Sequence, residues 1–483
     1  MGAIERSPPP HPSPNCRRFR RVILLFPVAR LPRPHSASTL RPPATHMSCL
    51  PQLRVSASTL TLAVSTLLAS TLRAQTLLPS APAPIDSTDP VAVMVGRLDL
   101  EKYKATIKGL TAFGDRRQGT KRNRDAIDWI EAQLKSYGCT NTERITYDWQ
   151  PRPPAAPAAP ATGAGRGAGA PPGGRGAGAP AGGAPGGGAA RAATASGGGR
   201  NRGVRTRTGV NSDSLAQRDA QLRLLNAEFT APGERQEVYC TKIGSTHPEE
   251  MYIVGGHMDG IGYGEAANDD GSGTAVVMEL ARIFSNPDVK TDRSIRFALW
   301  NNEESGLDGA RAYVTQREAL QGKESPAGSG KYPEPKWLGM VQHDMMMFDH
   351  GMPNPDGTMR KEQRPEADVN IEFQIASKQA AGAQSLAWAF HSANQKYATD
   401  YPAVVSPFMT NTDSGPFMDI IPAISLRENE RGTQIGSGWD PQWHQPTDLF
   451  TTYTDKDFKL GLNAAQTTLG AIGRLTGATL TQK

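Results

Sequence analysis

Residues able to do chemistry cluster where apolar runs of this chain end. His257 follows one apolar run, and the adjacent pair Glu303 and Glu304 follows the next; between them, Asp269 precedes a helical pattern. Binding sites in open α/β sheets lie at such element ends. Two adjacent acids at the end of an apolar strand are costly unless positive charge lies nearby, so a bound cation is the simplest account of them.

Two later residues complete a set of metal ligands. Asp344 ends a further apolar run, and His444 lies in the loop sequence WHQPTD before the last helical pattern. Zinc binds imidazole nitrogen and carboxylate oxygen, and a hydrolytic two-metal site needs ligands on both sides of one shared carboxylate. The chain offers such groups in the order His257, Asp269, Glu304, Asp344 and His444. We therefore predict a site for two zinc ions.

These residues also have purely structural interpretations. An isolated histidine such as His257 is usually a hydrogen-bonded core residue. Asp269 could serve only as the cap of the helix that follows, although Ser272 is better placed for that role. The acids that accompany the histidine favour the ligand interpretation.

Neighbouring residues compete for the last two ligand positions. Asp349 is the alternative to Asp344, and His343 and His350 are the alternatives to His444. The spacing of the surrounding motifs favours Asp344 and His444.

The elements that must position these residues alternate between strands and helices. Helical periodicity covers residues 91–137 (ending at Gly138), 272–284, 308–320, 379–397 and 454–475. Strand patterns cover residues 144–149, 237–243, 251–255, 295–300, 338–342 and 423–426. This alternation predicts an α/β fold with a mostly parallel mixed sheet and helices on both faces. The run 144–149 is predicted to be an edge strand that pairs with 237–243.

The basic composition of the chain is misleading. The whole sequence carries a formal charge of +6, but residues 1–75 hold ten of the 53 Lys and Arg residues and one of the 47 acids. A further eight Arg and no acid lie in residues 151–208, so the remainder carries an excess of 11 acids. The predicted folded part is therefore acidic, and nucleic acid is not an expected partner.

The N-terminal region predicts export. Residues 47–75 begin with Met47 and contain an apolar run and then Ala74, a pattern typical of a secretory signal peptide. The run is too short and too rich in Ser and Thr for a stable membrane span. We expect a secreted or periplasmic protein whose translation starts at Met47, which makes residues 1–46 a non-native or disordered extension.

A low-complexity insertion interrupts the predicted domain. Residues 151–208 consist almost wholly of Gly, Ala, Pro and Arg, a composition that cannot bury enough apolar surface to order the chain. A flexible arm that binds anionic polymers is one interpretation. A tolerated surface-loop insertion at the tip of the hairpin is favoured, because no aromatic residue is interleaved with the Arg residues.

Cysteine usage leaves two alternatives open. Cys16 and Cys49 lie in the part expected to be absent, so Cys139 and Cys240 remain. In an exported protein these two residues could form a disulfide. Two separate buried thiols are an equally good interpretation.

Six motifs in this order carry a family resemblance: GGHMDG, ANDDGSG, NNEESGLDGA, MVQHDMM, TNTDSGPF and WHQPTD. Each motif alone is weak, but six in register are strong evidence. Together they resemble the zinc aminopeptidases of peptidase family M28, over residues 95–150 and 210–478. The resemblance implies a three-layer zinc-exopeptidase fold, built from residues 91–150 and 209–478, that acts on peptides.

The resemblance also implies roles for the ligands. Asp269 would bridge two zinc ions, with His257 and Asp344 completing one site and Glu304 and His444 the other. The Asp269–Asp270 peptide would be cis.

Two acids would have catalytic roles in such a site. Glu303 would be the general base that takes a proton from the metal-bridging water and later hands it to the leaving amine. Asp259 would accept the second N–H of the His257 imidazole and fix its tautomer.

The chain departs from the family at several points. Trp443 stands where secreted members often carry a tyrosine that stabilises the oxyanion, so the donor is left open among Trp443, Tyr263 and Tyr401. No acid that would bind a substrate α-ammonium group is identified. The TNTDSGPF motif also differs from the family pattern, Ser-Asp-His before Pro-Phe, which affects the substrate pocket rather than the metal ligands.

Other activities remain alternatives. A dipeptidase or carboxypeptidase-like member of the family, a single-zinc glutaminyl cyclase, and a non-catalytic peptide-binding homologue would share the fold. Other hydrolase classes are disfavoured, because the chain lacks the spacing of a serine nucleophile elbow and the HExxH zinc motif.

Overall fold

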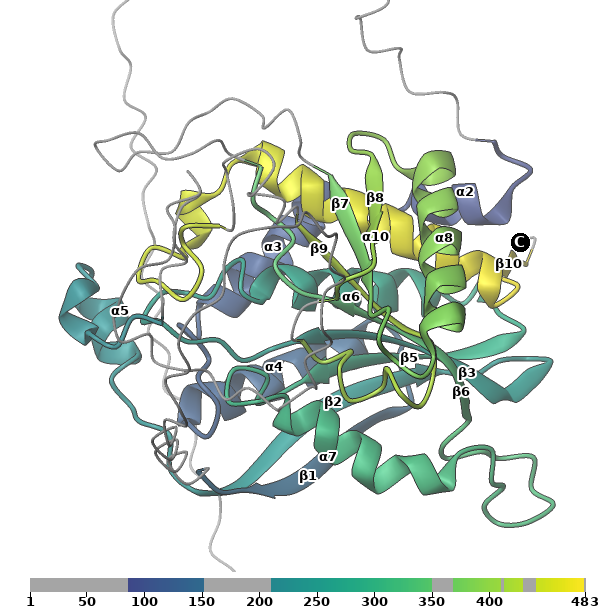
Figure 1. The fold of residues 1–483 in the computed structure, drawn as a ribbon, viewed down its shortest axis with the longest axis horizontal. Coiled ribbons are helices and arrows are strands. Elements are labelled where there is room, and N and C mark those ends of the chain that lie inside the picture. Colours follow the sequence, from purple (N-terminus) through teal and green to yellow (C-terminus); the bar gives the residue numbers. More distant parts are fainter. Residues whose placement is uncertain (1–85, 152–209, 350–367, 410–411, 429–439, 482–483) are drawn as a thin grey trace, which may run out of the picture. The chain divides into compact units, whose positions relative to one another are not determined.

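A mixed sheet is the centre of the fold (Figure 1). The computed structural model describes residues 86–151, 210–349, 368–409, 412–428 and 440–481. Within these residues the sheet has eight strands, in the order β1 (Thr142–Trp149), β2 (Gly233–Lys242), β5 (Arg293–Trp300), β3 (His247–His257), β6 (Lys336–His343), β9 (Ala423–Glu428), β7 (Val369–Phe373) and β8 (Ala403–Ser406).

The centre of the sheet is parallel, and its margins are mixed. Strands β5, β3, β6 and β9 run parallel to one another. Strand β2 is antiparallel to β5 and β1, while β7 is antiparallel to β9 and parallel to β8. The parallel strands present their carboxyl ends at one edge, which is where such sheets carry their sites.

One face of the sheet is covered by most of the helices. These are α2 (Pro90–Val95), α3 (Leu100–Thr111), α4 (Lys121–Ser136), α6 (Gly271–Phe284), α8 (Ala380–Tyr397) and α10 (Asp455–Leu475). Helix α6 lies against the central strands and is buried along almost its whole length, which suits its apolar composition. Its side chains join those of the neighbouring helices in the larger apolar core.

The opposite face carries a smaller core. Helix α7 (Asp308–Arg317) and the turns at 412–422 cover it, with Tyr313 and Phe417 packed against Trp300 and Trp337. Helices therefore lie on both faces, and the predicted α/β class with a mostly parallel mixed sheet is correct. In the described part of the chain, no helix combines the length and apolarity needed to cross a bilayer.

Several boundaries differ from the prediction. The predicted helical region 91–137 is three helices. Asp99 takes an extended conformation and caps the start of α3, which separates it from α2. Gly114 and Gly119 take positive φ values of 63° and 75° in the turn that separates α3 from α4. Strands β7 and β8 and the short helix α5 (Ala220–Leu225) were not predicted. The remaining short elements are β4 (Val289–Lys290), β10 (Thr479–Leu480) and single turns of 3₁₀ helix at Ser214–Ala216, Glu318–Leu320 and Phe450–Thr452.

The predicted edge hairpin is present. Strand β1 pairs with β2 in antiparallel register, from Thr142 opposite Cys240 to Trp149 opposite Gly233. Residues Ser80–Lys483 form one compact unit. The extension 1–46, the signal-like segment 47–75 and, apart from Pro151, the insertion 151–208 lie outside the described residues.

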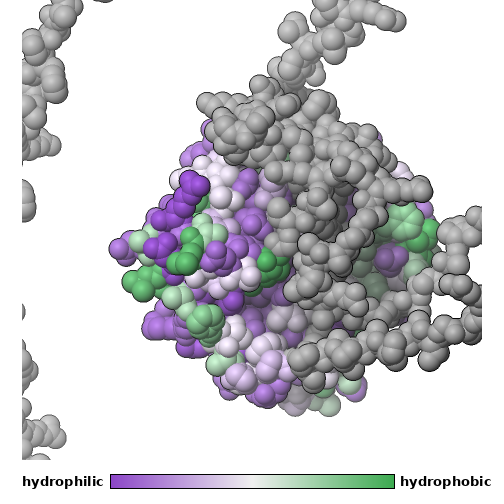
Figure 2. Space-filling view, turned by 60° about the vertical axis from the view of Figure 1, so that its left-hand side comes forward, coloured by the Kyte–Doolittle hydropathy of each residue, from purple (hydrophilic) through white to green (hydrophobic). Residues whose placement is uncertain are grey.

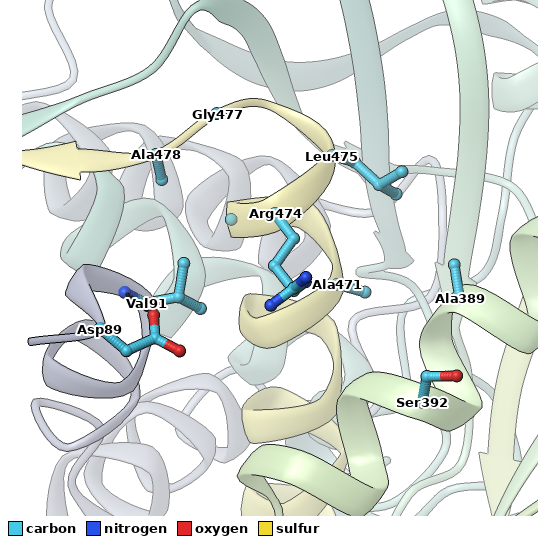
Figure 3. A pocket seen from close by; sticks show the side chains of 10 residues that line it. Asp89, Val91, Ala389, Ser392, Ala471, Arg474, Leu475, Gly477 and Ala478 are labelled. Carbon is cyan, nitrogen blue, oxygen red and sulfur yellow. Dashed lines mark hydrogen bonds between the residues drawn. The ribbon is translucent and has the colours of Figure 1, made fainter. Parts of the chain in front are cut away.

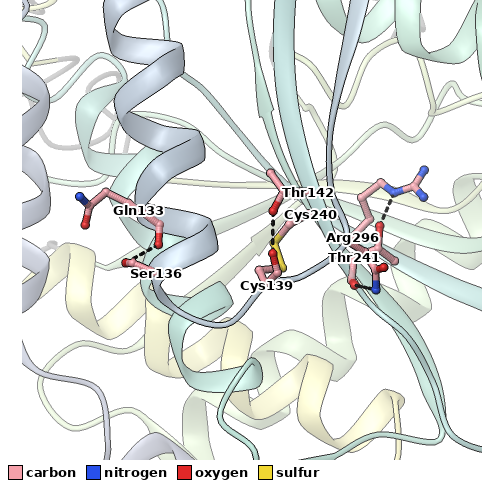
Figure 4. The surroundings of a disulfide bond; sticks show 8 residues. Gln133, Ser136, Cys139, Thr142, Cys240, Thr241 and Arg296 are labelled. Carbon is pink, nitrogen blue, oxygen red and sulfur yellow. Dashed lines mark hydrogen bonds between the residues drawn. A yellow bond between two sulfur atoms is a disulfide. The ribbon is translucent and has the colours of Figure 1, made fainter. Parts of the chain in front are cut away.

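The two open alternatives for the cysteines resolve to a disulfide (Figure 4). Cys139 follows α4 and Cys240 lies in β2, with their Cα atoms 6.1 Å apart and the sulfurs bonded. The turn from Cys139 into β1 is held by a local hydrogen bond, in which the Thr142 hydroxyl donates to the Cys139 carbonyl at 2.7 Å. The bond joins positions 101 residues apart across the long connection between β1 and β2.

Candidate metal centre

Three parallel neighbours deliver most of the predicted ligands to one edge of the sheet. His257 is the last residue of β3, Asp344 follows the last residue of β6, and Glu304 lies in the turn after β5. Strand β3 lies between β5 and β6, so the three side chains meet above adjacent strand ends. His444 enters from the separate loop before α10.

One group of ligands surrounds His257. Its Nε2 atom lies 3.3 Å from Oδ1 of Asp269 and 3.8 Å from Oδ1 of Asp344. All three side chains are buried. Their ligand atoms lie close enough together to coordinate one metal ion.

A second group shares Asp269 with the first. His444 Nε2 lies 2.9 Å from Oδ2 of Asp269 and 2.9 Å from Oε2 of Glu304. The two oxygens of Asp269 therefore face different histidines, which is the arrangement a bridging carboxylate requires. The structure brings together all five residues that the sequence suggested as ligands.

The electrostatics favour positive charge between these groups. Burial opposes the charged imidazole of His444, but Glu304 and Asp269 outweigh it and raise the pKa of His444 to about 10. Burial raises the pKa of Glu304 to about 7, with a further contribution from Asp269. The acids thus stabilise a cation here, whether it is an imidazolium or a metal ion.

Asp270 holds the loop that carries Asp269. Its carboxylate accepts N–H groups from His257 at 3.0 Å, Gly273 at 2.8 Å and Met345 at 3.2 Å. Asp270, rather than the predicted Ser272, therefore caps α6. The Asp269–Asp270 peptide is cis, as the family resemblance implied.

Asp448 supports the same loop and was missed by the sequence analysis. Its two carboxylate oxygens accept the backbone N–H groups of Asn268 at 2.9 Å and of Asp269 at 3.1 Å, and the Tyr453 hydroxyl donates to it at 3.0 Å. Its place in the WHQPTD motif, four residues after His444, was the available signal. Asp448 thus links the loop of His444 to the loop of Asp269.

Asp259 contacts His257 differently from the expectation. The His257 Nδ1 atom lies 3.0 Å from the backbone carbonyl oxygen of Asp259 and 3.8 Å from its carboxylate. The carboxylate instead accepts the backbone N–H of Glu303 at 3.1 Å. The carbonyl therefore fixes the imidazole tautomer, and the carboxylate orients the turn that carries Glu303 and Glu304.

Glu303 lies half-buried in that turn. Burial raises the pKa of its carboxyl well above the usual value, and the nearby charges of Glu304 and Asp413 add to this, while His257 opposes it. Its neighbour Glu304 contributes to the metal-ligand group, so the adjacent acids have different surroundings.

The three candidates for an oxyanion donor have different surroundings. The Trp443 indole stacks on the His444 imidazole, with ring centroids 3.9 Å apart and planes inclined by 28°. The Tyr401 hydroxyl donates to Asp349 at 2.6 Å and is therefore engaged elsewhere. The Tyr263 ring lies beneath the Arg117 guanidinium. Trp443 is thus the candidate in direct contact with a predicted ligand.

A segment outside all the sequence motifs holds the His444 loop in place. This clamp segment, residues 211–226, follows the insertion. The Gln217 amide donates to the backbone carbonyls of Tyr263 at 2.8 Å and Pro446 at 2.9 Å, and the Asn211 N–H donates to the His444 carbonyl at 3.1 Å. It therefore joins the loop after β3 to the loop of the last histidine.

A comparison with known proteins found a family model that matches the part of the chain that holds these residues. A model described as peptidase family M28 matches residues 238–460, which include all the predicted ligands and Glu303. Over these residues, the chain is therefore similar to peptidase family M28.

Relatives within and around this family match only in part. Aminopeptidase YwaD of Bacillus subtilis (strain 168) is 38% identical over 79 residues, 16% of this chain and 17% of that protein. Carboxypeptidase Q of Xenopus laevis is 37% identical over 71 residues, 15% of each chain. These alignments cover less than a fifth of the length of either relative. The solved structure of an aminopeptidase from Aneurinibacillus sp. strain AM-1 covers 81% of this chain and 97% of its own, at 18% identity and a TM-score of 0.49.

The donor set of the M28 segment suits zinc. Imidazole nitrogens and carboxylate oxygens are its ordinary ligands, and every ligand atom lies in one buried cluster. Among the described residues, the buried Oε1 of Glu304 has no hydrogen-bond donor. Buried carboxylate oxygens are rarely left without a partner, so a cation would satisfy this atom.

The competing residues of the M28 segment have other partners. His343 Nδ1 bonds the Gly255 carbonyl at 3.0 Å and its Nε2 lies 2.8 Å from the Thr468 hydroxyl, as in a core histidine. Asp349 accepts the Tyr401 hydroxyl and the Asp457 carboxylate accepts its N–H. His350 lies outside the described residues.

A hollow elsewhere on the compact unit belongs to neither ligand group. It has a volume of about 450 Å³ and lies between α2, α8 and the end of α10, where Asp89 and Arg474 face each other (Figure 3). Asp89 is already engaged, since it caps α2 and binds Lys396 at 2.5 Å and the Tyr397 hydroxyl at 2.9 Å. This hollow therefore offers no metal ligand set.

Proposed function

We propose that this chain is an exopeptidase that holds two zinc ions and hydrolyses the N-terminal peptide bond of peptides. The observation that supports it most is the shared carboxylate: Asp269 faces His257 with one oxygen and His444 with the other. Asp344 and Glu304 complete the two groups. Two ligand groups favour a two-metal peptidase over a single-zinc cyclase, and an intact set of ligands argues against a non-catalytic homologue.

Zinc bound at this centre would act as a Lewis acid toward the scissile carbonyl. It would also lower the pKa of water, which then loses a proton more readily as it attacks that carbonyl. Glu303 is the residue that moves protons. Its carboxylate removes a proton as the water oxygen bonds to the carbonyl carbon, and it returns that proton to the amine nitrogen as the C–N bond breaks. The Asp259 carboxylate holds the turn that positions Glu303 through the backbone N–H of that residue.

Metal analysis combined with kinetics tests this proposal. We expect Glu303→Ala to keep two zinc ions per chain and lose turnover by at least about 10²–10⁴-fold, the usual contribution of a general base. Asp269→Ala, by contrast, should lose the metal itself because both groups share that carboxylate. An active Glu303→Ala protein, or an Asp269→Ala protein with full zinc content, would refute the assignment.

The position of the cleaved bond has a second candidate. The carboxypeptidase Q match favours a carboxypeptidase or dipeptidase within the family. Aminoacyl-nitroanilides assayed beside N-blocked dipeptides separate the two: hydrolysis of the first alone supports an aminopeptidase. Hydrolysis of the blocked substrates alone would replace that proposal.

Export is proposed on the sequence of residues 47–75. Their signal-like pattern supports delivery to the periplasm or medium, with translation from Met47. Sequencing the N-terminus of the native protein checks both points, since a mature chain that begins after Ala74 is expected. A terminus at Gly2 or Ala3 would contradict them.

A further inference from the structure

An arginine is bonded directly to one of the proposed metal ligands. The Arg427 guanidinium, on β9, donates from Nη2 to Oδ2 of Asp344 at 2.6 Å. Both side chains are almost fully enclosed, at 3% and 4% exposure. The other oxygen of Asp344 faces His257. Asp344 thus has a cation fixed on one oxygen and a place for a metal ion at the other.

The second ligand group has a different electrostatic balance. Glu304 contacts His444 through Oε2, and its other oxygen has no donor among the described residues. Within the same part of the chain, no lysine or arginine pairs with Glu304 or with the shared Asp269. The charge of Glu304 is therefore not offset by a bonded cation as the charge of Asp344 is.

We propose that Arg427 makes the two metal positions unequal. The position of His257 and Asp344 binds its ion more weakly and fills second, and the position of Glu304 and His444 fills first. This inference rests on the proposed two-metal function and deepens it. Its physical basis is repulsion. A divalent ion that enters the His257 and Asp344 position meets a buried guanidinium across one carboxylate, where screening by water is weak.

The orientation of Asp344 is a separate effect of the same arginine. A donor on Oδ2 also holds Oδ1 toward His257, and such support usually strengthens metal binding. Orientation and charge predict opposite results when the guanidinium is replaced, so a neutral donor at position 427 distinguishes them. If charge dominates, its removal strengthens the weaker position. With Arg427 in place and metal limiting, the wild-type chain would hold one ion, at the Glu304 and His444 position.

Titration of metal-free protein with Co²⁺, followed by visible absorbance and calorimetry, tests this directly. Wild type should bind two ions with dissociation constants at least tenfold apart, and Asp344→Asn should abolish the weaker phase while keeping the tighter one. Arg427→Gln removes the charge but keeps an N–H donor, and should strengthen the weaker phase at least tenfold. Arg427→Lys keeps the charge and should preserve the gap.

Specific outcomes overturn the inference. Equal affinities in wild type, loss of the tighter phase in Asp344→Asn, or an unchanged or weaker second phase in folded Arg427→Gln would each do so. If Arg427→Gln does not fold by circular dichroism, the wild-type and Asp344→Asn titrations together with Arg427→Lys still decide, since a lysine variant with equalised affinities contradicts a charge effect. Failure of wild type to bind any ion would instead refute the proposed function.

Discussion

At the scale of single residues, one glycine fixes how closely the last histidine approaches the centre. Gly262 has φ of 100°, and a Cβ atom there would lie 2.4 Å from the backbone carbonyl of His444. Both the left-handed conformation and the close backbone contact exclude a side chain. The position of the His444 ligand therefore depends on the absence of one methyl group in a loop far from it in sequence.

We expect Gly262→Ala to displace the His444 loop and to lower the zinc content from two ions toward one per chain, with a parallel loss of activity. Metal analysis of the purified variant measures this. Gly322→Ala is the control, because Gly322 also has positive φ but its nearest neighbour is the Lys336 Cβ at 3.8 Å. Equal zinc content in both variants would show that the close contact does not position His444.

The sequence predicted the five residues that the structure brings together as candidate ligands, but it missed most of the residues that support them. His257, Glu304 and Asp344 were proposed because they follow apolar strands, where buried acids and imidazoles usually need a partner of opposite charge. Asp269 was proposed because it lies between two such strands, just before a helix. Supporting residues carry no such local signal: Asp448 resembles any loop acid until its contacts with the loop of Asp269 are known. The capping error at Ser272 has the same origin, since Asp270 is the better acceptor only once the loop geometry is fixed.

At the scale of elements, the clamp segment joins two loops that the sheet alone does not hold. Gln217 is 3% exposed and uses both amide hydrogens on carbonyls from different loops. The same segment and its continuation leave Leu215, Leu224 and Phe229 largely exposed. Figure 2, in which the α5 side of Figure 1 comes forward, shows apolar patches among polar ones. Specific hydrogen bonds therefore hold the clamp segment in place more than burial of its apolar side chains does.

Replacing Gln217 with leucine should loosen the His444 loop. The Tyr263 and Pro446 carbonyls would lose a buried donor, at about 1–3 kcal/mol for each group. We expect a lower free energy of unfolding in urea and weaker binding at the Glu304 and His444 position.

Asn226→Leu is the matched control for this substitution. Asn226 donates to the Gly264 carbonyl and accepts the Asp115 N–H, so it bonds the same β3 loop but not the His444 loop. It should lose comparable stability and keep both zinc affinities. A Gln217→Leu protein that binds metal like wild type would mean that the clamp has only a stabilising role.

Helices and strands were predicted correctly where the apolar pattern was long. They were missed where pairing with a neighbouring strand or loop determines the structure. Helix α4 has apolar residues at helical spacing, and strands β3, β5 and β6 contain nearly continuous apolar runs, because the sheet is covered on both faces. Strands β7 and β8 are four or five residues long, and they become strands through pairing with β9 and with each other. The clamp segment has no periodicity at all, so its position could only follow from the loops that it binds.

At the scale of the whole molecule, the disulfide closes a long loop that contains the insertion. Replacing Cys139 and Cys240 by serine should lower the free energy of unfolding by about 2–4 kcal/mol, because the cross-link restricts the unfolded chain over 101 positions. Urea unfolding of wild type with a reductant should match the double variant, and the reductant should leave the variant unchanged. No difference between oxidised and reduced wild type would show that the bond contributes nothing to stability.

The proposed metals tie together segments that are distant in the chain. The candidate ligands come from three adjacent strand ends, from the loop before α6 and from the loop before α10, and they form two groups that share Asp269. Bound zinc would therefore stabilise the native arrangement, since the unfolded chain has no equivalent site. At free zinc of 1,000 times the dissociation constant, this linkage is worth about 4 kcal/mol per site. Two sites together give about 8 kcal/mol. A unit larger than about 250 residues shifts by only about 1–2 °C per kcal/mol, so we expect a chelator that removes both ions to lower the Tm by roughly 10 °C. Calorimetry with chelator and then with restored zinc measures the shift. Asp269→Ala should not respond to the chelator, and a wild-type Tm that is equally insensitive would contradict a metal held by these residues.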